Sequence, residues 1–347
     1  MIKPNNLKTG DKVAIVSLSS GLAGEEKFKH RYELGKKRLE EDFGLEIITM
    51  PNALKGLKFN YENPEARAKD LMDAFKDKSI KGIISNIGGD DTIRLLPYID
   101  YDVIKNNPKV FLGYSDTTVN HFMMYKAGLQ SFYGPCVLCD FAENVEMHEY
   151  TKKYVQEVLF KGNKNIEITS SPYWTSELLG WHIAENDNTK RKLEKEERGY
   201  EVLQGTGVVE GELLGGCIDT FPGIIGTEIW PDKEEWRGKI LFIETSEEHL
   251  KPDRVKRILR SLHSQGILEV INGIIIGKPK DETYYEEYKE MYKEFFEIEA
   301  ERTDLPIMYN LNFGHASPLC ILPYGLRVRV DCDNKKVILL EEAVITA

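Results

Sequence analysis

The sequence predicts an α/β protein, with an N-terminal parallel sheet of Rossmann-like type and a C-terminal part that also mixes strands and helices. Three observations lead to this fold class. Short apolar runs alternate with amphipathic helical segments over the first 165 residues, a polar and charge-dense stretch follows, and apolar runs return after residue 205. Strands separated by helices need crossover connections and therefore form a parallel sheet. We place the domains at 1–165 and 206–347, joined by a linker with a substrate-proximal loop at 166–205, because 347 residues suffice for two domains.

The N-terminal strands are apolar runs that end in glycine, serine or a polar turn. In chain order they are KVAIVSLSS (12–20), LEIITM (45–50), IKGIISNI (80–87) and PKVFLGYS (108–115). Helices are predicted over 25–43, where Gly44 is a plausible stop, over 62–78, with Pro64 in the first turn, and from about Asp116 onward. In a parallel sheet, functional loops gather at the carboxyl ends of the strands.

The C-terminal part contains two further strands, KILFIET (239–245) and INGIIIGKP (271–279), separated by a helix over 251–266 that Gly266 closes. A charged helix is predicted over 284–302. Alternating residues around Asp333 and Asn334 predict a hairpin near the end of the chain.

The composition excludes several classes of protein. A formal net charge of −11 argues against a nucleic-acid partner, and no nucleic-acid-binding motif is present. No apolar run approaches the length of a membrane span, and the first residues lack a signal-peptide pattern, so we expect a cytoplasmic protein without a membrane partner. The five scattered cysteines fit a reducing compartment. Cys136 and Cys139 are interpreted as packed thiols, and no metal or cofactor is predicted.

The segment FLGYSDTT (111–118) carries the most informative local pattern. An apolar strand runs into Ser115 and then directly into a helix, the context that exposes a nucleophilic serine at the end of a sheet. Backbone N–H groups at the start of that helix are suited to bind an oxyanion. Thr117 stands where the G-x-S-x-G pattern has its second glycine. The alternative is that Ser115 only caps the helix.

Gly88, Gly89 and Asp90 end the preceding strand and are expected beside the Ser115 loop. Glycines allow a ligand to approach the backbone, so we count Gly88 and Asp90 among the candidate substrate-binding residues. A simple tight turn is the alternative. A rival functional interpretation is the phosphate loop of NAD kinase-like phosphotransferases, although Asp91 interrupts the pattern that those enzymes show.

A serine nucleophile requires a base, because its hydroxyl hardly ionises near neutral pH. His315 lies on a glycine-flanked loop after an apolar strand, a favoured place for catalytic side chains, while His249 and His182 are reserve candidates. His121 lies about 9 Å along the helix from Ser115 and is excluded. Glu244 ends an apolar strand, where orienting an imidazole would give its carboxylate a partner; the alternative is a carboxylate that faces water. Glu247 and Glu248 are interpreted as solvated charges.

The chain as a whole resembles the LD-carboxypeptidase family of serine peptidases, and within it the microcin C immunity peptidases. The segments that carry the resemblance, in order, are KTGDKVAIVSLSSG, IGGDDTIRLLPYIDYDVIKNNPKVFLGYSDTT, SFYGP, GELLGG, KILFIET, INGIIIGKP and NFGHASP. The resemblance implies a Ser115–Glu244–His315 triad, with the Gly89 and Asp116 amides as the oxyanion hole. It also implies a nucleophile-bearing N-terminal domain, a β-rich α/β C-terminal domain that carries Glu and His, a site between them, and a homodimer.

Two features depart from many relatives of that family. Cys217 stands after Gly215 and Gly216, where many relatives have asparagine, and the stretch between Ser171 and Gly205 is long. The long stretch resembles the immunity branch, in which aromatic residues of this region contact a nucleotide, so Trp181 and Trp174 are candidates to stack on an adenine ring.

Three enzymatic functions stay open from the sequence, beside the alternative of a non-catalytic ligand-binding relative with an inert triad. The leading hypothesis is metal-independent cleavage of the amide between an amino acid and a modified nucleotide. The second is removal of the terminal D-alanine from murein tetrapeptides. The third, from another class, is a nucleotide-binding phosphotransferase built on Gly88, Gly89 and Asp90. In the first two cases the partner is a small-molecule or peptide substrate.

Overall fold

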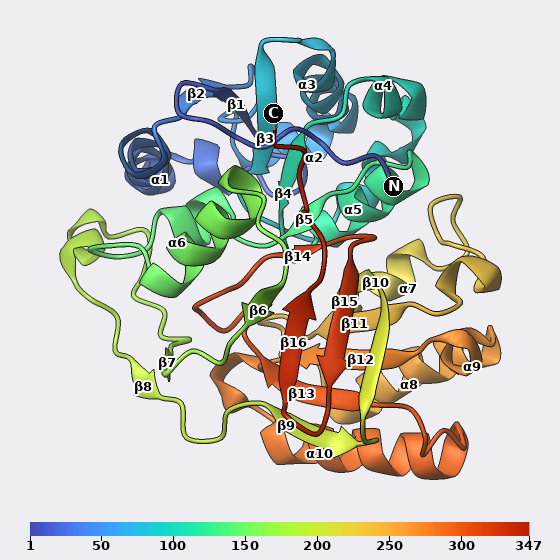
Figure 1. Ribbon diagram of the computed structural model, residues 1–347. Coiled ribbons are helices and arrows are strands. Elements are labelled where there is room, and N and C mark those ends of the chain that lie inside the picture. Colours follow the sequence, from blue (N-terminus) through green and yellow to red (C-terminus); the bar gives the residue numbers. More distant parts are fainter. Residues whose placement is uncertain (347) are drawn as a thin grey trace.

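The computed structural model describes residues 1–346 and contains two large sheets, one in the upper half and one in the lower half of Figure 1. The upper sheet has the strand order β14-β5-β4-β3-β1-β2. Its strands are β1 (Lys12–Val16), β2 (Glu46–Thr49), β3 (Ile80–Ser85), β4 (Val110–Gly113), β5 (Phe132–Tyr133) and β14 (Leu322–Pro323). All pairs from β2 to β5 are parallel, which confirms the predicted α/β fold class.

Helices lie on both sides of the upper sheet, with α1 on one side and α3, α4 and α5 on the other (Figure 1). The helices of this half are α1 (Lys29–Phe43), α2 (Leu57–Glu62), α3 (Pro64–Lys76), α4 (Tyr101–Asn106), α5 (Thr117–Lys126) and α6 (Glu149–Val155). As predicted, Gly44 ends α1: it adopts a left-handed conformation and its N–H bonds to the Leu39 carbonyl.

The lower sheet has the order β6-β16-β15-β10-β11-β12-β13-β9. Its strands are β6 (Ile166–Ile168), β9 (Glu201–Gln204), β10 (Val208–Cys217), β11 (Ile240–Glu244), β12 (Gly273–Gly277), β13 (Ile307–Leu311), β15 (Arg327–Asp331) and β16 (Lys336–Leu339). Strands β10 to β13 are parallel, and the pairs on either side of them are antiparallel. The predicted hairpin around Asp333 is the β15–β16 pair.

Helices α7 (Phe221–Ile224), α8 (Pro252–Ser264), α9 (Ile267–Val270) and α10 (Tyr285–Glu294) accompany the lower sheet. Helix α8 buries Val255, Ile258, Leu259 and Leu262, whose spacing of three and four residues puts all of them on one face. The predicted charged helix over 284–302 corresponds to α10 and a following π-helical turn over Phe295–Glu299.

The segment predicted as a linker contributes strands to the lower sheet. Strands β6 and β9 lie within 166–205, and only the short β7–β8 pair (Tyr173–Trp174 and Glu194–Lys195) stands apart from both large sheets. The predicted boundary between residues 205 and 206 therefore divides the lower sheet, which takes strands from both sides of it.

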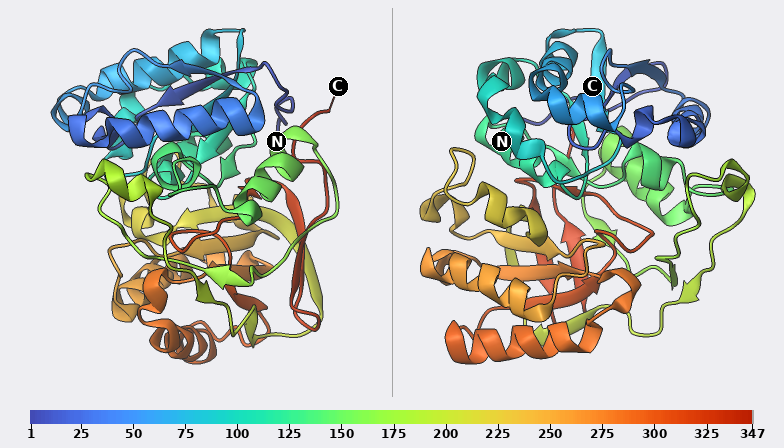
Figure 2. Two further views of the ribbon diagram at one scale, coloured as in Figure 1. Left: turned by 90° about the vertical axis from the view of Figure 1, so that its left-hand side faces the viewer. Right: turned by 180° about the vertical axis from the view of Figure 1, so that it is seen from behind.

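Besides the connection from β5 to β6, two later segments tie the halves together. After β13 the chain passes to the upper sheet, where β14 pairs with β5, and then returns to β15. The last residues also run back to the start of the chain: Ile345 pairs with Asn5, and Figure 2 shows both termini beside the upper half. Among residues 1–346, no helix is both long and apolar enough to cross a membrane.

The apolar face of α8 gives a test of this packing. We expect Leu259→Ala to lower the free energy of unfolding by about 2–5 kcal/mol, because the side chain is fully buried and its loss leaves a cavity. Arg257→Ala, on the exposed face of the same helix, should change it by less than about 0.5 kcal/mol. Urea unfolding of both variants measures the difference, and equal effects would contradict the assigned face.

Candidate active site

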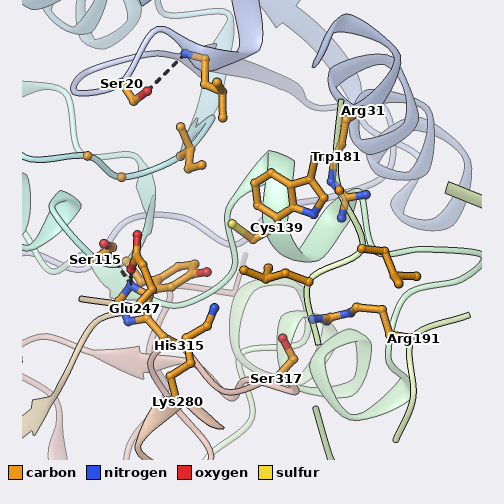
Figure 3. A pocket seen from close by; sticks show the side chains of 18 residues that line it. Ser20, Arg31, Ser115, Cys139, Trp181, Arg191, Glu247, Lys280, His315 and Ser317 are labelled. Carbon is orange, nitrogen blue, oxygen red and sulfur yellow. Dashed lines mark hydrogen bonds and ion pairs between the residues drawn. The ribbon is translucent and has the colours of Figure 1, made fainter. Parts of the chain in front are cut away.

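A cavity of about 460 Å³ opens between the two halves of the molecule. The upper half contributes loops that follow β1, β3 and β4, and the lower half contributes loops that follow β11, β12 and β13. In Figure 3, Ser115, His315 and Glu247 gather at one end of the cavity, while Trp181, Arg31 and Arg191 lie at the other. The carboxyl ends of both parallel sheets thus face a shared site.

Ser115 lies on the sharp turn between β4 and α5. Its φ angle is +63°, a left-handed conformation that non-glycine residues rarely adopt, and it aims the side chain out of the sheet end. Gly88, after β3, approaches closely: a Cβ atom there would lie 2.8 Å from Ser115 Oγ and 3.1 Å from Asp116 N. Only glycine leaves room beside the serine hydroxyl.

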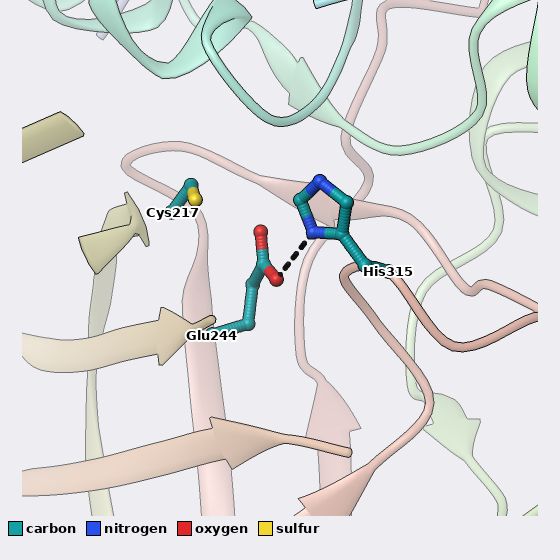
Figure 4. A group of neighbouring side chains, drawn as sticks. All are labelled: Cys217, Glu244 and His315. Carbon is teal, nitrogen blue, oxygen red and sulfur yellow. Dashed lines mark hydrogen bonds and ion pairs between the residues drawn. The ribbon is translucent and has the colours of Figure 1, made fainter. Parts of the chain in front are cut away.

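The structure brings Ser115, His315 and Glu244 into one hydrogen-bonded chain. His315 Nε2 lies 3.1 Å from Ser115 Oγ, and His315 Nδ1 lies 2.7 Å from Glu244 Oε2, the contact drawn in Figure 4. Glu244 is the last residue of β11 and its side chain is fully buried. Gly314 has a φ of +98°, and a Cβ there would lie 2.5 Å from Glu244 Oε2, so a glycine is needed to bring His315 against this carboxylate.

Tyr133, in β5 of the upper sheet, connects this chain to the nucleophile loop. Its hydroxyl donates to Glu244 Oε1 at 2.5 Å and accepts the Ser115 backbone N–H at 3.2 Å. Burial and the nearby Glu244 charge raise the pKa of Tyr133 well above its usual value, so the hydroxyl keeps its proton and donates. The sequence analysis did not single out Tyr133, although it lies in the SFYGP segment.

The Asp116 side chain holds the loops in place. Its Oδ2 accepts hydrogen bonds from Ser19 Oγ at 2.6 Å and from the Thr92 N–H and hydroxyl at 2.9 and 2.6 Å. Buried Arg67 donates to the Leu18 and Ser19 carbonyls. The loops after β1, β3 and β4 are thereby fixed to one another beside Ser115.

Backbone N–H groups for an oxyanion are present next to the hydroxyl. Within residues 1–346, the N–H groups of Gly89 and Asp116 have no hydrogen-bond acceptor in the protein. Both flank the space beside Ser115, and Gly89 lines the cavity. Such groups stabilise the negative charge that develops on a carbonyl oxygen during acyl transfer.

Glu247 is a second carboxylate at His315, and the sequence analysis had interpreted it as solvated. Its Oε2 lies 3.0 Å from His315 Nε2, while its side chain stays 57% exposed to the cavity. The hydrogen bond to His315 lowers the pKa of Glu247 to about 2. Burial lowers the pKa of His315, but the Glu244 and Glu247 carboxylates outweigh burial and raise it to about 10.

The other end of the cavity is aromatic and cationic. Trp181 lines the cavity, and the Arg31 guanidinium lies 4.6 Å from its ring centroid. Arg191 also lines the cavity and pairs with Glu143, while Lys280 lies nearer His315 (Figure 3). Trp174 lies away from the lining, with the Lys278 ammonium 4.3 Å from its ring centroid.

Of the remaining candidates, Asp90 is exposed and does not line the cavity, whereas Gly88 does. His249 faces Asp281, away from Ser115. His121 bonds to Ser131 and to the Gly113 carbonyl, and burial lowers its pKa to about 3. His315 is therefore the histidine that the fold brings to Ser115.

Cys217, Glu244 and His315 lie close enough together to raise the question of a metal site (Figure 4). Each donor atom already has a protein partner: the Cys217 thiol donates to Asp219, and both Glu244 oxygens accept hydrogen bonds. Burial and the Glu244 charge raise the pKa of Cys217, which disfavours the thiolate that a metal would bind. We interpret the cluster as part of the hydrogen-bonded chain.

The arrangement contains the parts that nucleophilic acyl transfer requires. A hydroxyl lies within reach of an imidazole, a buried carboxylate orients that imidazole, and two free N–H groups lie beside the hydroxyl. Of Gly88, Gly89 and Asp90, on which the phosphotransferase hypothesis rests, only Gly89 belongs to this set.

The chain is similar to known proteins along nearly its whole length. Residues 13–134 match the LD-carboxypeptidase N-terminal domain, and residues 210–330 match the LD-carboxypeptidase C-terminal domain. The microcin C7 self-immunity protein MccF of Escherichia coli is 28% identical over 98% of this chain and 96% of its own.

Solved structures show the same likeness in three dimensions. A MccF-like protein from Streptococcus pneumoniae, in complex with AMP, is 41% identical and has a TM-score of 0.88, over 96% of this chain and 99% of its own. MccF in complex with glutamyl sulfamoyl guanosine is 27% identical with a TM-score of 0.84, over 99% of this chain and all of its own (100%).

Tyr133 offers a test of the hydrogen-bonded chain. Tyr133→Phe leaves Glu244 Oε1 buried without its donor, so we expect the free energy of unfolding to fall by about 1–3 kcal/mol. The loosened imidazole should also lower kcat, roughly 10-fold to 100-fold, in any reaction that uses it. Tyr173→Phe, at an exposed tyrosine, is the matched control. Unfolding and turnover measurements in which the two variants behave alike would contradict this role.

Proposed function

This chain belongs to the LD-carboxypeptidase family of serine peptidases, and from that premise we propose that it hydrolyses an amide bond with a Ser115–His315–Glu244 triad. The observation that carries the proposal is the pair of contacts at His315, 3.1 Å to Ser115 Oγ and 2.7 Å to Glu244 Oε2. These distances are those of a base in reach of its nucleophile and of the group that orients it.

In the first half of the reaction, Ser115 Oγ attacks the carbonyl carbon of the substrate while its proton passes to His315 Nε2. The carbonyl oxygen becomes an oxyanion, which accepts hydrogen bonds from the Gly89 and Asp116 N–H groups. Glu244 stabilises the imidazolium through Nδ1, and Tyr133 holds Glu244 in place. His315 then gives the proton to the leaving nitrogen, and the C–N bond breaks.

In the second half, a water molecule takes the place of the leaving group. His315 removes a proton from the water as its oxygen attacks the acyl-enzyme carbonyl, and Ser115 leaves with the proton that His315 returns. The products are a free carboxylic acid and the regenerated hydroxyl. No step requires a cofactor.

The substrate that we propose is an aminoacyl amide of a modified nucleotide, such as an aminoacyl sulfamoyl adenosine. Similarity to MccF, which has been solved with aminoacyl sulfamoyl nucleosides, supports this class. The cavity supports it too, because the Trp181 ring, which could stack on a purine, lines the end of the cavity opposite Ser115. Trp174 is not part of this proposal, since it packs against Lys278.

The second candidate is a carboxypeptidase that removes D-alanine from murein tetrapeptides, which the LD-carboxypeptidase domain matches favour. Purified protein incubated separately with aminoacyl sulfamoyl adenosine and with tetrapeptide distinguishes the two. Release of amino acid from the first compound alone supports the immunity-type activity, and release of D-alanine alone supports the second candidate. The homodimer and the cytoplasmic location stay predictions from the sequence.

Replacement of the nucleophile tests the reaction class. We expect Ser115→Ala to lose roughly 10³-fold or more in kcat, because the acyl-enzyme can no longer form, and to keep the wild-type unfolding midpoint to within a few degrees. Chelation of divalent cations should leave the wild-type rate unchanged. A phosphotransferase would behave in the opposite way, depending on Mg²⁺ and surviving the substitution.

The charge state of His315 predicts the pH profile. Only the neutral imidazole acts as base, and the Glu244 and Glu247 carboxylates raise its pKa to about 10, so kcat/KM should fall as the pH falls below that value. Initial rates from pH 5 to pH 10, with stability checked at each pH, measure the slope. A rate that is flat between pH 5 and pH 8 would exclude His315 as the base.

A further inference from the structure

Glu247 occupies a position that conflicts with the proposed role of His315. Its carboxylate lies 3.0 Å from Nε2, the nitrogen that must accept the Ser115 proton. The ion pair with Glu247 favours the imidazolium, whose protonated Nε2 has no lone pair left for that proton. A charged imidazole therefore lies between two carboxylates, and a productive complex has to give Glu247 another partner.

The protein does not supply that partner from the cavity wall. Arg31 and Arg191 line the cavity but are paired with Asp187 and Glu143. Lys280 lines it as well, yet no ion pair joins it to Glu247 or to another carboxylate of residues 1–346. A substrate that fills the cavity also removes water from Glu247, and a carboxylate that loses water without gaining a partner is costly. Lys280 contributes to the lowered pKa of Glu247 but forms no ion pair with it, so we take the substrate as the source of the missing cation.

The distances locate that cation on the substrate. Glu247 Oε2 lies within about 6 Å of Ser115 Oγ, because both are about 3 Å from the same nitrogen. The attacked carbon is bonded to Ser115 Oγ in the intermediate, so Glu247 reaches groups one or two bonds from the scissile carbonyl. An amine on the α-carbon meets this condition, whereas a cation on the far part of the leaving group, beyond the scissile nitrogen, does not.

We propose that Glu247 is a specificity-determining residue that binds a protonated α-amine beside the scissile carbonyl, and that this amine draws Glu247 away from His315 and frees the imidazole to act as base. The inference rests on the proposed peptidase function and narrows its substrate class to acyl groups with a free α-amine. Substrates whose amine is acylated or absent leave Glu247 on His315 and are turned over slowly.

A matched pair of compounds tests this selectivity. One is alanyl sulfamoyl adenosine, and the other is its propionyl analogue, which differs only in lacking the α-amine. For the wild-type protein we expect kcat/KM to favour the amine by roughly 30-fold or more, the size of effect that follows when a desolvated charge loses its partner. Glu247→Gln should reduce this preference to less than about 5-fold, because the propionyl analogue then meets an imidazole free of Glu247 and the amine loses its carboxylate partner.

Glu248→Gln is the matched control, because it removes the same charge from the neighbouring exposed residue, which does not line the cavity. It should keep the wild-type preference. If Glu247→Gln also keeps that preference, the inference is overturned.

Binding to a Ser115→Ala background separates this inference from the proposed function. Calorimetry on Ser115→Ala, with and without Glu247→Gln, should show an amine preference in affinity only when Glu247 is present. Equal affinity for both compounds in Ser115→Ala overturns amine recognition. If the wild-type protein cleaves neither compound while the Glu247-dependent affinity difference is observed, the proposed function fails and amine recognition is supported.

The pH profile supplies a readout that a merely structural role would not change. The groups that face His315 are Glu244 from β11, Glu247 from the loop that follows, Ser115 and Tyr114 from the turn after β4, and Cys217 from β10. Glu247→Gln removes one of the two carboxylates at His315 and leaves the Glu244 carboxylate in place. With the propionyl analogue, the acid limb of kcat/KM should therefore move to lower pH in this variant and stay in place in Glu248→Gln. An acid limb that does not move contradicts the competition for Nε2.

Discussion

The hydrogen-bonded chain from Tyr133 through Glu244 and His315 to Ser115 is the interaction on which the rest of the site depends. Two of its members belong to the upper sheet and its loops, and Glu244 ends a strand of the lower sheet. His315 lies on the segment that crosses from β13 to β14, so the hydrogen-bonded chain extends across the contact between the upper and lower halves. A small shift between the halves would break both bonds of the imidazole, and for this reason the packing of this contact governs the chemistry.

Charge balance is the second constraint on the site. Glu244 is buried with both oxygens occupied, and this fixed negative charge favours the imidazolium. Glu247 adds a second carboxylate on the side of Ser115, where it is exposed and free to exchange partners. The first carboxylate orients the base permanently, whereas the second competes with the nucleophile until something else binds it. Both carboxylates favour the charged imidazole, but Glu244 contacts Nδ1, whereas Glu247 contacts Nε2, the nitrogen that faces Ser115.

Much of the fold was predictable from local pattern. Alternating apolar runs and amphipathic segments predicted the strands β1 to β4, the helices between them and the hairpin of β15 and β16, and the structure confirms these elements. The segment 166–205 was interpreted as a linker because its strands β6 and β9 are short and lie in polar sequence. Edge strands of this kind take their conformation from pairing with β16 and β13 rather than from their own residues.

For the site, the sequence by itself determined the residues that stand at strand ends and on glycine-flanked turns: Ser115, Glu244 and His315. Their local motifs made them candidates beside simpler interpretations, such as a helix cap for Ser115, and the family resemblance grouped the three as a triad. Only the tertiary structure decided that Tyr133 donates to Glu244 and that Glu247 contacts His315 instead of water. Those contacts join residues more than sixty positions apart, the first across the two sheets and the second between loops after β11 and β13, and no local pattern of residue types encodes a distance of that kind.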